Sequence, residues 1–179
     1  FLGRIHPIKN IELLIKSISE LKNFKEKRFK LIIAGTGKNN YIKKLKKLIT
    51  KLNLDKEIKF IGFIDGKEKN ILLSESYFLV LPSLSENFGN VIIESMAQST
   101  PVITSKGTPW EIINKYNAGY YIDNSIDQWI KTIKKTILLN KDEYIKMRRN
   151  SYRLIDKKFN IQYNIKNWVS AYGKILNEK

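Results

Sequence analysis

Residues 79–104, LVLPSLSENFGNVIIESMAQSTPVIT, decide the fold of this chain. The apolar run Leu79–Leu81 predicts a buried strand, which a Pro-Ser turn ends. A loop then leads into Asn90–Gln98, where apolar residues have helical spacing, and Pro101–Thr104 predicts a second buried strand. Strand, helix and strand in this order are typical of one unit of a parallel sheet.

Two carboxylates accompany this unit. Glu86 lies in the loop, and Glu94 lies about one turn into the helix. Ligands of parallel sheets bind where strands end and helices begin, and helical side chains lean toward the N-terminus of their helix. Both carboxylates are therefore expected at the same binding site, at the carboxyl ends of the strands. Acidic residues near a helix start can also simply complement the helix dipole, and position alone favours that simpler interpretation.

Strands and helices alternate through the first two thirds of the chain. Further strands are predicted at Phe29–Ala34, Ile58–Ile61 and Ala118–Ile122, and the strand that contains Leu79–Leu81 is predicted to begin at Tyr77. Helices are predicted from Asn10, over Tyr41–Leu52 and Lys67–Ser74, and from Glu111, and then without strands at Ser125–Leu139, Lys141–Ile155 and Ile161–Leu176. Continuous apolar strands with short connections indicate an α/β fold with a doubly wound parallel sheet. We expect one domain over residues 1–179, with the sheet core in 1–124 and an all-helical segment in 125–179.

Right-handed crossovers would bring every strand-to-helix loop to one edge of this sheet. The loops concerned are Arg4–Lys9, Gly35–Gly37, Gly62–Ile64, Ser83–Gly89 and Ser105–Pro109. Phe1 and Leu2 look like the end of a strand, so we expect the chain to be cut from a longer protein.

The amino-acid composition excludes several classes of protein. The 179 residues are 42% hydrophobic and include no cysteine, which favours a packed core and excludes disulfides and thiolate metal sites. No apolar run approaches the roughly 20 residues that span a bilayer, and we expect a cytoplasmic protein. The net charge of +16 could attract an anionic membrane surface or nucleic acid. Solvated lysines on amphipathic helices explain it more simply, and nucleic acid is not expected as a partner.

Two cations precede the first helix. Gly3 allows a tight turn after a strand, and Arg4 and Lys9 flank the approach to the helix. A guanidinium and an ammonium can together hold a diphosphate, although two cations on a loop are also unremarkable in so basic a chain. Gly35-Thr36-Gly37 lacks the third glycine of a dinucleotide fingerprint, which favours an ordinary turn.

The run from Glu86 through Gly89 to Glu94 resembles the E-x7-E signature of retaining glycosyltransferases of family 4, the group 1 transferases. Four other segments are similar to motifs of this family, in the family's order: Phe1–Lys9, Ile33–Gly37, Phe60–Phe63 and Ser95–Ile103. The resemblance implies the Rossmann-like, donor-binding half of a two-domain GT-B enzyme, with the N-terminal acceptor domain absent from this chain.

Carried over residue by residue, the resemblance assigns Arg4 and Lys9, beside Gly3, to the donor diphosphate. It places the distal phosphate at the backbone N–H groups of Asn90 and Val91. Because these groups neutralise the leaving diphosphate, no metal and no cofactor are expected. Arg4 and Lys9 therefore count, with Glu86, as catalytic residues.

The resemblance also implies how the rest of the donor is held. Glu94 would bind the ribose hydroxyls, and Glu86, with the backbone of Phe88–Gly89, would bind the transferred sugar. The backbone of Phe63–Ile64 would face the base. A UDP-, GDP- or ADP-linked hexosyl donor and a glycan or lipid-linked acceptor of cell-surface polysaccharide synthesis are implied. The isolated domain should hardly transfer, because the acceptor wall is missing.

Two other functions stay open. An epimerase of the same architecture would release free nucleotide without an acceptor, and a basic polyanion- or membrane-surface module would bind independently of Glu94. His6 has no evident partner carboxylate, and Lys106–Trp110 receives no role. Trp168 and Tyr172, one turn apart in the last helix, are expected to pack in the core or at a domain interface.

Overall fold

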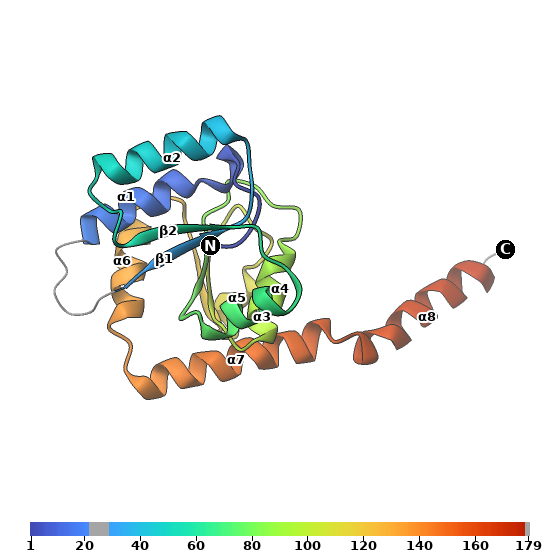
Figure 1. Cartoon of the computed structure of the whole chain (residues 1–179). Helices are drawn as coiled ribbons and strands as arrows, with labels where there is room; N and C mark the ends of the chain where they lie inside the picture. The colour runs from blue at the N-terminus through green and yellow to red at the C-terminus, as the bar shows by residue number, and fades with distance from the viewer. Residues whose placement is uncertain (22–28, 178–179) are drawn as a thin grey trace.

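The computed structural model describes residues 1–21 and 29–177, and strands alternate with helices in it as far as residue 125 (Figure 1). The strands are β1 (Leu31–Ala34), β2 (Ile58–Gly62), β3 (Leu79–Leu81), β4 (Val102–Ser105) and β5 (Gly119–Ile122). The helices between them are η1 (Pro7–Lys9), α1 (Ile11–Leu21), α2 (Asn39–Lys51), α3 (Gly66–Glu75), α4 (Asn90–Ala97) and α5 (Ile112–Lys115). Three further helices follow: α6 (Ile126–Ile137), α7 (Lys141–Phe159) and α8 (Ile161–Asn177). The α/β fold class and its helical C-terminal part are confirmed.

All strand pairs are parallel, as predicted, but they form two hydrogen-bonded groups. β1 pairs with β2, and β3, β4 and β5 pair in that order. Leu2 and Ile5 form single parallel bridges to Ala34 and Gly37, so the first residues of the chain continue the β1 side. The doubly wound sheet is therefore interrupted between β1 and β3.

Backbone hydrogen bonds join the strand-to-helix loops at one edge of these sheets. Leu84 N–H donates to the Ile8 carbonyl at 2.8 Å, which ties the loop after β3 to the first loop. Glu86 N–H donates to Gly107 at 2.9 Å, and Gly35 N–H donates to Gly62 at 2.6 Å. Parallel strands force this convergence, because their carboxyl ends share one edge.

Gly35 marks the closest backbone approach on the β1 side. A Cβ at this position would lie 1.9 Å from the carbonyl oxygen of Gly3, so no side chain fits there. The Gly35-Thr36-Gly37 turn therefore serves to pack the first segment of the chain against the end of β1.

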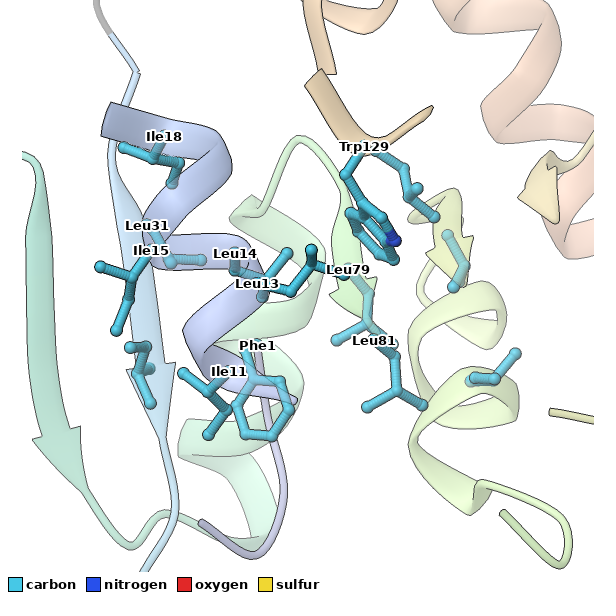
Figure 2. Close-up of a cluster of buried hydrophobic side chains, with 14 of the residues drawn as sticks. Phe1, Ile11, Leu13, Leu14, Ile15, Ile18, Leu31, Leu79, Leu81 and Trp129 are labelled. Carbon is cyan, nitrogen blue, oxygen red and sulfur yellow. The ribbon is translucent and has the colours of Figure 1, made fainter. Parts of the chain in front are cut away.

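One apolar cluster holds the two strand groups and their helices together (Figure 2). The buried residues of α1 include Ile11, Leu14, Ile15 and Ile18, with the spacing of one helical face. They share the cluster with Leu31 of β1, Leu79 and Leu81 of β3, and Trp129 of α6. The helix α1 thus spans the interruption between β1 and β3.

The last helix projects away from the rest of the chain (Figure 1). Trp168 and Tyr172 are 63% and 62% exposed, so the expectation that they pack in the core is wrong. The helical spacing of the apolar residues predicted an apolar face on α8. Nothing in the described part of the chain shows what covers that face, so packing against another domain stays a prediction. The described residues include no helix that is long and apolar enough to cross a membrane.

The first residue is buried against β1. The amine of Phe1 donates a hydrogen bond to the Ile32 carbonyl at 2.9 Å, and the side chain is buried in the cluster. Burial lowers the pKa of this amine from the ordinary value of 8.0 to about 5, because the charged form loses its hydration.

Candidate functional site

An ion pair between Lys9 and Glu86 lies at the centre of the loop edge. Lys9 ends η1, Glu86 follows β3, and the ammonium contacts the carboxylate oxygen Oε1 across 77 positions of sequence. The two side chains are only 14% and 12% exposed, so the pair is shielded from much of the screening that water provides. The structure thus brings together one cation and one carboxylate that the sequence analysis selected.

Further hydrogen bonds fix the position of Glu86. Ser83, which is fully buried, donates its hydroxyl hydrogen bond to the same Oε1 at 2.9 Å. The Ser83 carbonyl accepts from the hydroxyl of Ser105 and from Nδ2 of Asn124 at 3.1 Å. Ser83 and Asn124, in the loops after β3 and β5, and Ser105, at the end of β4, therefore orient one carboxylate.

Asn124 is supported in turn from the core. Its Nδ2 also donates to the Pro82 carbonyl at 2.8 Å, and its Oδ1 accepts from the indole N–H of Trp129 at 3.0 Å. Trp129 is fully buried. Sequence reasoning missed Ser83 and Asn124. Each lies two residues after the end of a strand, β3 and β5, and that position was the only signal in the sequence.

The sequence predicted no role for Lys106–Trp110. In the structure, this segment packs against the loop that carries Glu86. A Cβ at Gly107 would lie 2.4 Å from the carbonyl oxygens of Ser83 and Leu84, so the two loops touch through backbone. The indole N–H of Trp110 donates to the Phe88 carbonyl. Glu86 and its neighbours are therefore held at both ends of their loop.

The helix α4 begins beside this loop. Gly89 precedes it with φ of 82°, a left-handed conformation that glycine adopts without strain, and no side chain caps the helix there. The N–H groups of Asn90 and Val91 belong to the first turn, where a helix provides no internal acceptors. Such a helix start can bind an anion.

The second carboxylate has its own lysine. Lys69 Nζ of α3 lies 2.9 Å from Glu94 Oε1 of α4, with side chains 24% and 36% exposed. Sequence reasoning missed Lys69, because a single lysine in a lysine-rich helix carries no signal. The residues before α3 are accessible: Phe63 is 68% exposed, and Ile64 is partly exposed.

The first loop provides the remaining groups. Arg4 is exposed, and Gly3 N–H donates to the Ala34 carbonyl at 3.0 Å, which anchors the turn before it. His6 accepts the N–H of Ile8 on Nδ1 at 3.3 Å and so caps η1. That contact gives the histidine a structural role.

Taken together, these loops offer carboxylates that accept hydrogen bonds from hydroxyls, cations, and the open start of a helix. That set suits a ligand that combines hydroxyl groups with phosphates. The five loops that sequence analysis expected at one edge all take part in the backbone contacts described above. No described contact joins Glu86 directly to Glu94.

Comparison with known proteins identifies the family of this chain. The family model for glycosyl transferases group 1 matches residues 1–154. The O-antigen chain mannosyltransferase RfbU of Salmonella typhimurium is 33% identical over 132 residues, which make up 74% of this chain and 36% of the relative. The chain spans between 20% and 43% of the length of four curated relatives that it matches.

Solved structures share the architecture. The C-terminal domain of LpcC, a glycosyl transferase group 1 family protein from Francisella tularensis, has a TM-score of 0.78 and 28% identity over 90% of this chain and 84% of that one. HepE of Anabaena, solved with UDP and glucose, has a TM-score of 0.83 and 20% identity over 97% of this chain and 47% of that one. The fold is that of GT-B glycosyltransferases, and the chain belongs to the family of glycosyl transferases group 1.

Proposed function

We propose that this chain is the donor-binding half of a retaining glycosyltransferase, which moves a hexosyl group from a nucleotide-diphosphate sugar to a glycan or lipid-linked acceptor. The partly buried Lys9–Glu86 pair, four residues before the open start of α4, carries the proposal. It sets a cation next to a carboxylate, and we propose that the diphosphate and the sugar of one donor would join there. UDP and glucose, the ligands of the Anabaena protein, have this chemistry.

The diphosphate would lie between the first loop and α4. Arg4 and Lys9 would neutralise its charge, and the N–H groups of Asn90 and Val91 would bind the distal phosphate. Lys9 can contact a phosphate and Glu86 at once, because an ammonium has three donors. The cations replace a metal in this proposal.

The hydroxyl groups of the donor would be held by the two carboxylates. Glu94 would accept from the ribose, with Lys69 fixing its orientation, and Glu86 with the backbone of Phe88–Gly89 would hold the sugar. The base would face the backbone of Phe63–Ile64. Glu86 would serve in this proposal as an acceptor of hydrogen bonds rather than as an acid.

Transfer would pass through an oxocarbenium-like state. A neutralised nucleotide diphosphate leaves without a proton donor, so the chain needs no carboxylic acid of the glycosidase kind. The acceptor would approach from the face that the diphosphate leaves, and the phosphate would take its proton. Without the acceptor domain, this chain should bind nucleotide and transfer hardly at all.

We predict that Glu94→Ala weakens nucleotide binding by about 10- to 100-fold, since a charged hydrogen-bond acceptor contributes about 1.5–3 kcal/mol. Calorimetric titration of this chain with UDP, GDP and ADP measures the loss for the nucleotide that binds. Glu20→Ala, at an exposed position of α1, is the matched control and should bind as the parent does. Unchanged affinity in Glu94→Ala, with binding that salt abolishes, would favour a basic polyanion-binding module.

We predict that Glu86→Gln in the enzyme with both domains lowers kcat by about 10²–10³, the effect of removing one electrostatic group from a transition state. The substitution keeps the shape of the side chain but loses its charge. Affinity of the isolated chain for free nucleotide should change less than threefold. Near-normal turnover in Glu86→Gln would refute the assigned role, and release of free nucleotide without acceptor by the parent would favour an epimerase.

A further inference from the structure

Trp110, in the loop after β4, connects the loop that carries Glu86 to the end of α7. Its side chain is only 1% exposed, and its indole N–H donates a hydrogen bond to the Phe88 carbonyl. The centroid of its ring lies 5.4 Å from that of Phe88 and 5.2 Å from that of Phe159. Phe159 is the last residue of α7. Three segments that are far apart in the sequence therefore meet at one tryptophan.

The hydrogen bond from Trp110 fixes the orientation of the peptide group between Phe88 and Gly89. This peptide is trans, and in a trans peptide the C=O and the N–H point in opposite directions. Because the Phe88 carbonyl points at the indole, the Gly89 N–H points away from it. Within residues 1–21 and 29–177, no protein group accepts a hydrogen bond from this N–H. The peptide therefore presents one unpaired donor on the side away from Trp110.

This donor lies beside the start of α4. Gly89 has a left-handed conformation, with φ of 82° and ψ of 62°, and Asn90 is the first residue of the right-handed helix. Neighbouring residues of opposite hand turn successive N–H groups toward one side of the chain, an arrangement that binds anions. The next two N–H groups, of Asn90 and Val91, are those to which the proposed function assigns the distal phosphate. The Gly89 N–H is therefore the first donor of the same row.

We propose that Trp110 is a positioning residue for the donor substrate. By holding the Phe88 carbonyl, it keeps the Gly89 N–H turned toward the point where the distal phosphate joins the sugar. This inference rests on the proposed function. Trp110 is buried and acts through the peptide group, not by contact with the donor. An indole N–H suits this role, because it can only donate and a buried donor needs a fixed acceptor.

A purely structural role for Trp110 would have a different signature. Trp110 also belongs to the apolar cluster, so its substitution lowers stability in either case. A loss of stability alone does not favour one ligand over another. The Gly89 N–H, however, would contact the distal phosphate, which a nucleoside monophosphate lacks. Loss of positioning should therefore weaken the binding of a nucleoside diphosphate and leave that of the monophosphate nearly unchanged.

Calorimetric titration of the parent chain and two variants tests this proposal. The ligands are UDP and UMP, GDP and GMP, or ADP and AMP, whichever pair includes the diphosphate that the parent binds most tightly. Trp110→Phe removes the indole N–H and keeps an aromatic ring between Phe88 and Phe159. Phe159→Leu is the matched control, because it removes a ring from the same contact and keeps the hydrogen bond.

Trp110→Phe should lower the ratio of diphosphate to monophosphate affinity about tenfold, the effect of weakening one hydrogen bond to a charged group, and Phe159→Leu should change it less than about twofold. An unchanged ratio in Trp110→Phe, while Glu94→Ala still weakens nucleotide binding, would overturn this inference and leave the proposed function standing. A parent chain that binds none of the three diphosphates would overturn both.

If Trp110→Phe does not fold, NMR spectra of the amides in the parent chain test the same proposal. The Gly89 amide proton should move further downfield with the diphosphate than with the monophosphate, because only the diphosphate gives it a charged acceptor. The indole proton of Trp110 should exchange slowly with solvent, as expected for a buried hydrogen bond. Equal shifts at Gly89 with the two ligands, or rapid exchange of the indole proton, would overturn the inference.

Discussion

The ion pair between Lys9 and Glu86 is the constraint on which the site depends. It joins the first loop to the loop after β3, and both charges are largely withdrawn from water. A partly buried charge without its partner is costly, so each residue stabilises the position of the other. Ser83, Gly107 and the Trp129–Asn124 hydrogen bond then hold Glu86 from the opposite side.

The parallel strands explain why residues so distant in sequence meet. Every strand ends at the same edge of the sheet, so each loop that follows a strand can contribute a side chain or backbone group to one binding site. The two strand groups are joined by the apolar cluster, to which α1 contributes beside Leu31 of β1 and Leu79 of β3.

Much of the fold follows from sequence, because buried parallel strands are continuous apolar runs and amphipathic helices have a 3.6-residue period. Ile58–Ile61 was expected as a strand and is β2, one residue longer. Glu86 and Lys9 could be predicted as site residues, because they lie in loops that follow predicted strands and match motifs of a known family. The pairing of Glu94 with Lys69 and the roles of Ser83 and Asn124 could not, because they depend on how separate elements pack. The apolar face of α8 was recognised, but spacing says nothing of what covers it.

A double-mutant cycle on Lys9→Met and Glu86→Gln tests whether this ion pair couples the two loops. Urea unfolding of the parent, both single variants and the double variant gives the free energy that couples the two residues. We predict a coupling of at least about 1 kcal/mol, because residues in contact through desolvated charges depend on each other. Losses of stability that add within about 0.3 kcal/mol would show that the two side chains act independently and would contradict a coupled ion pair.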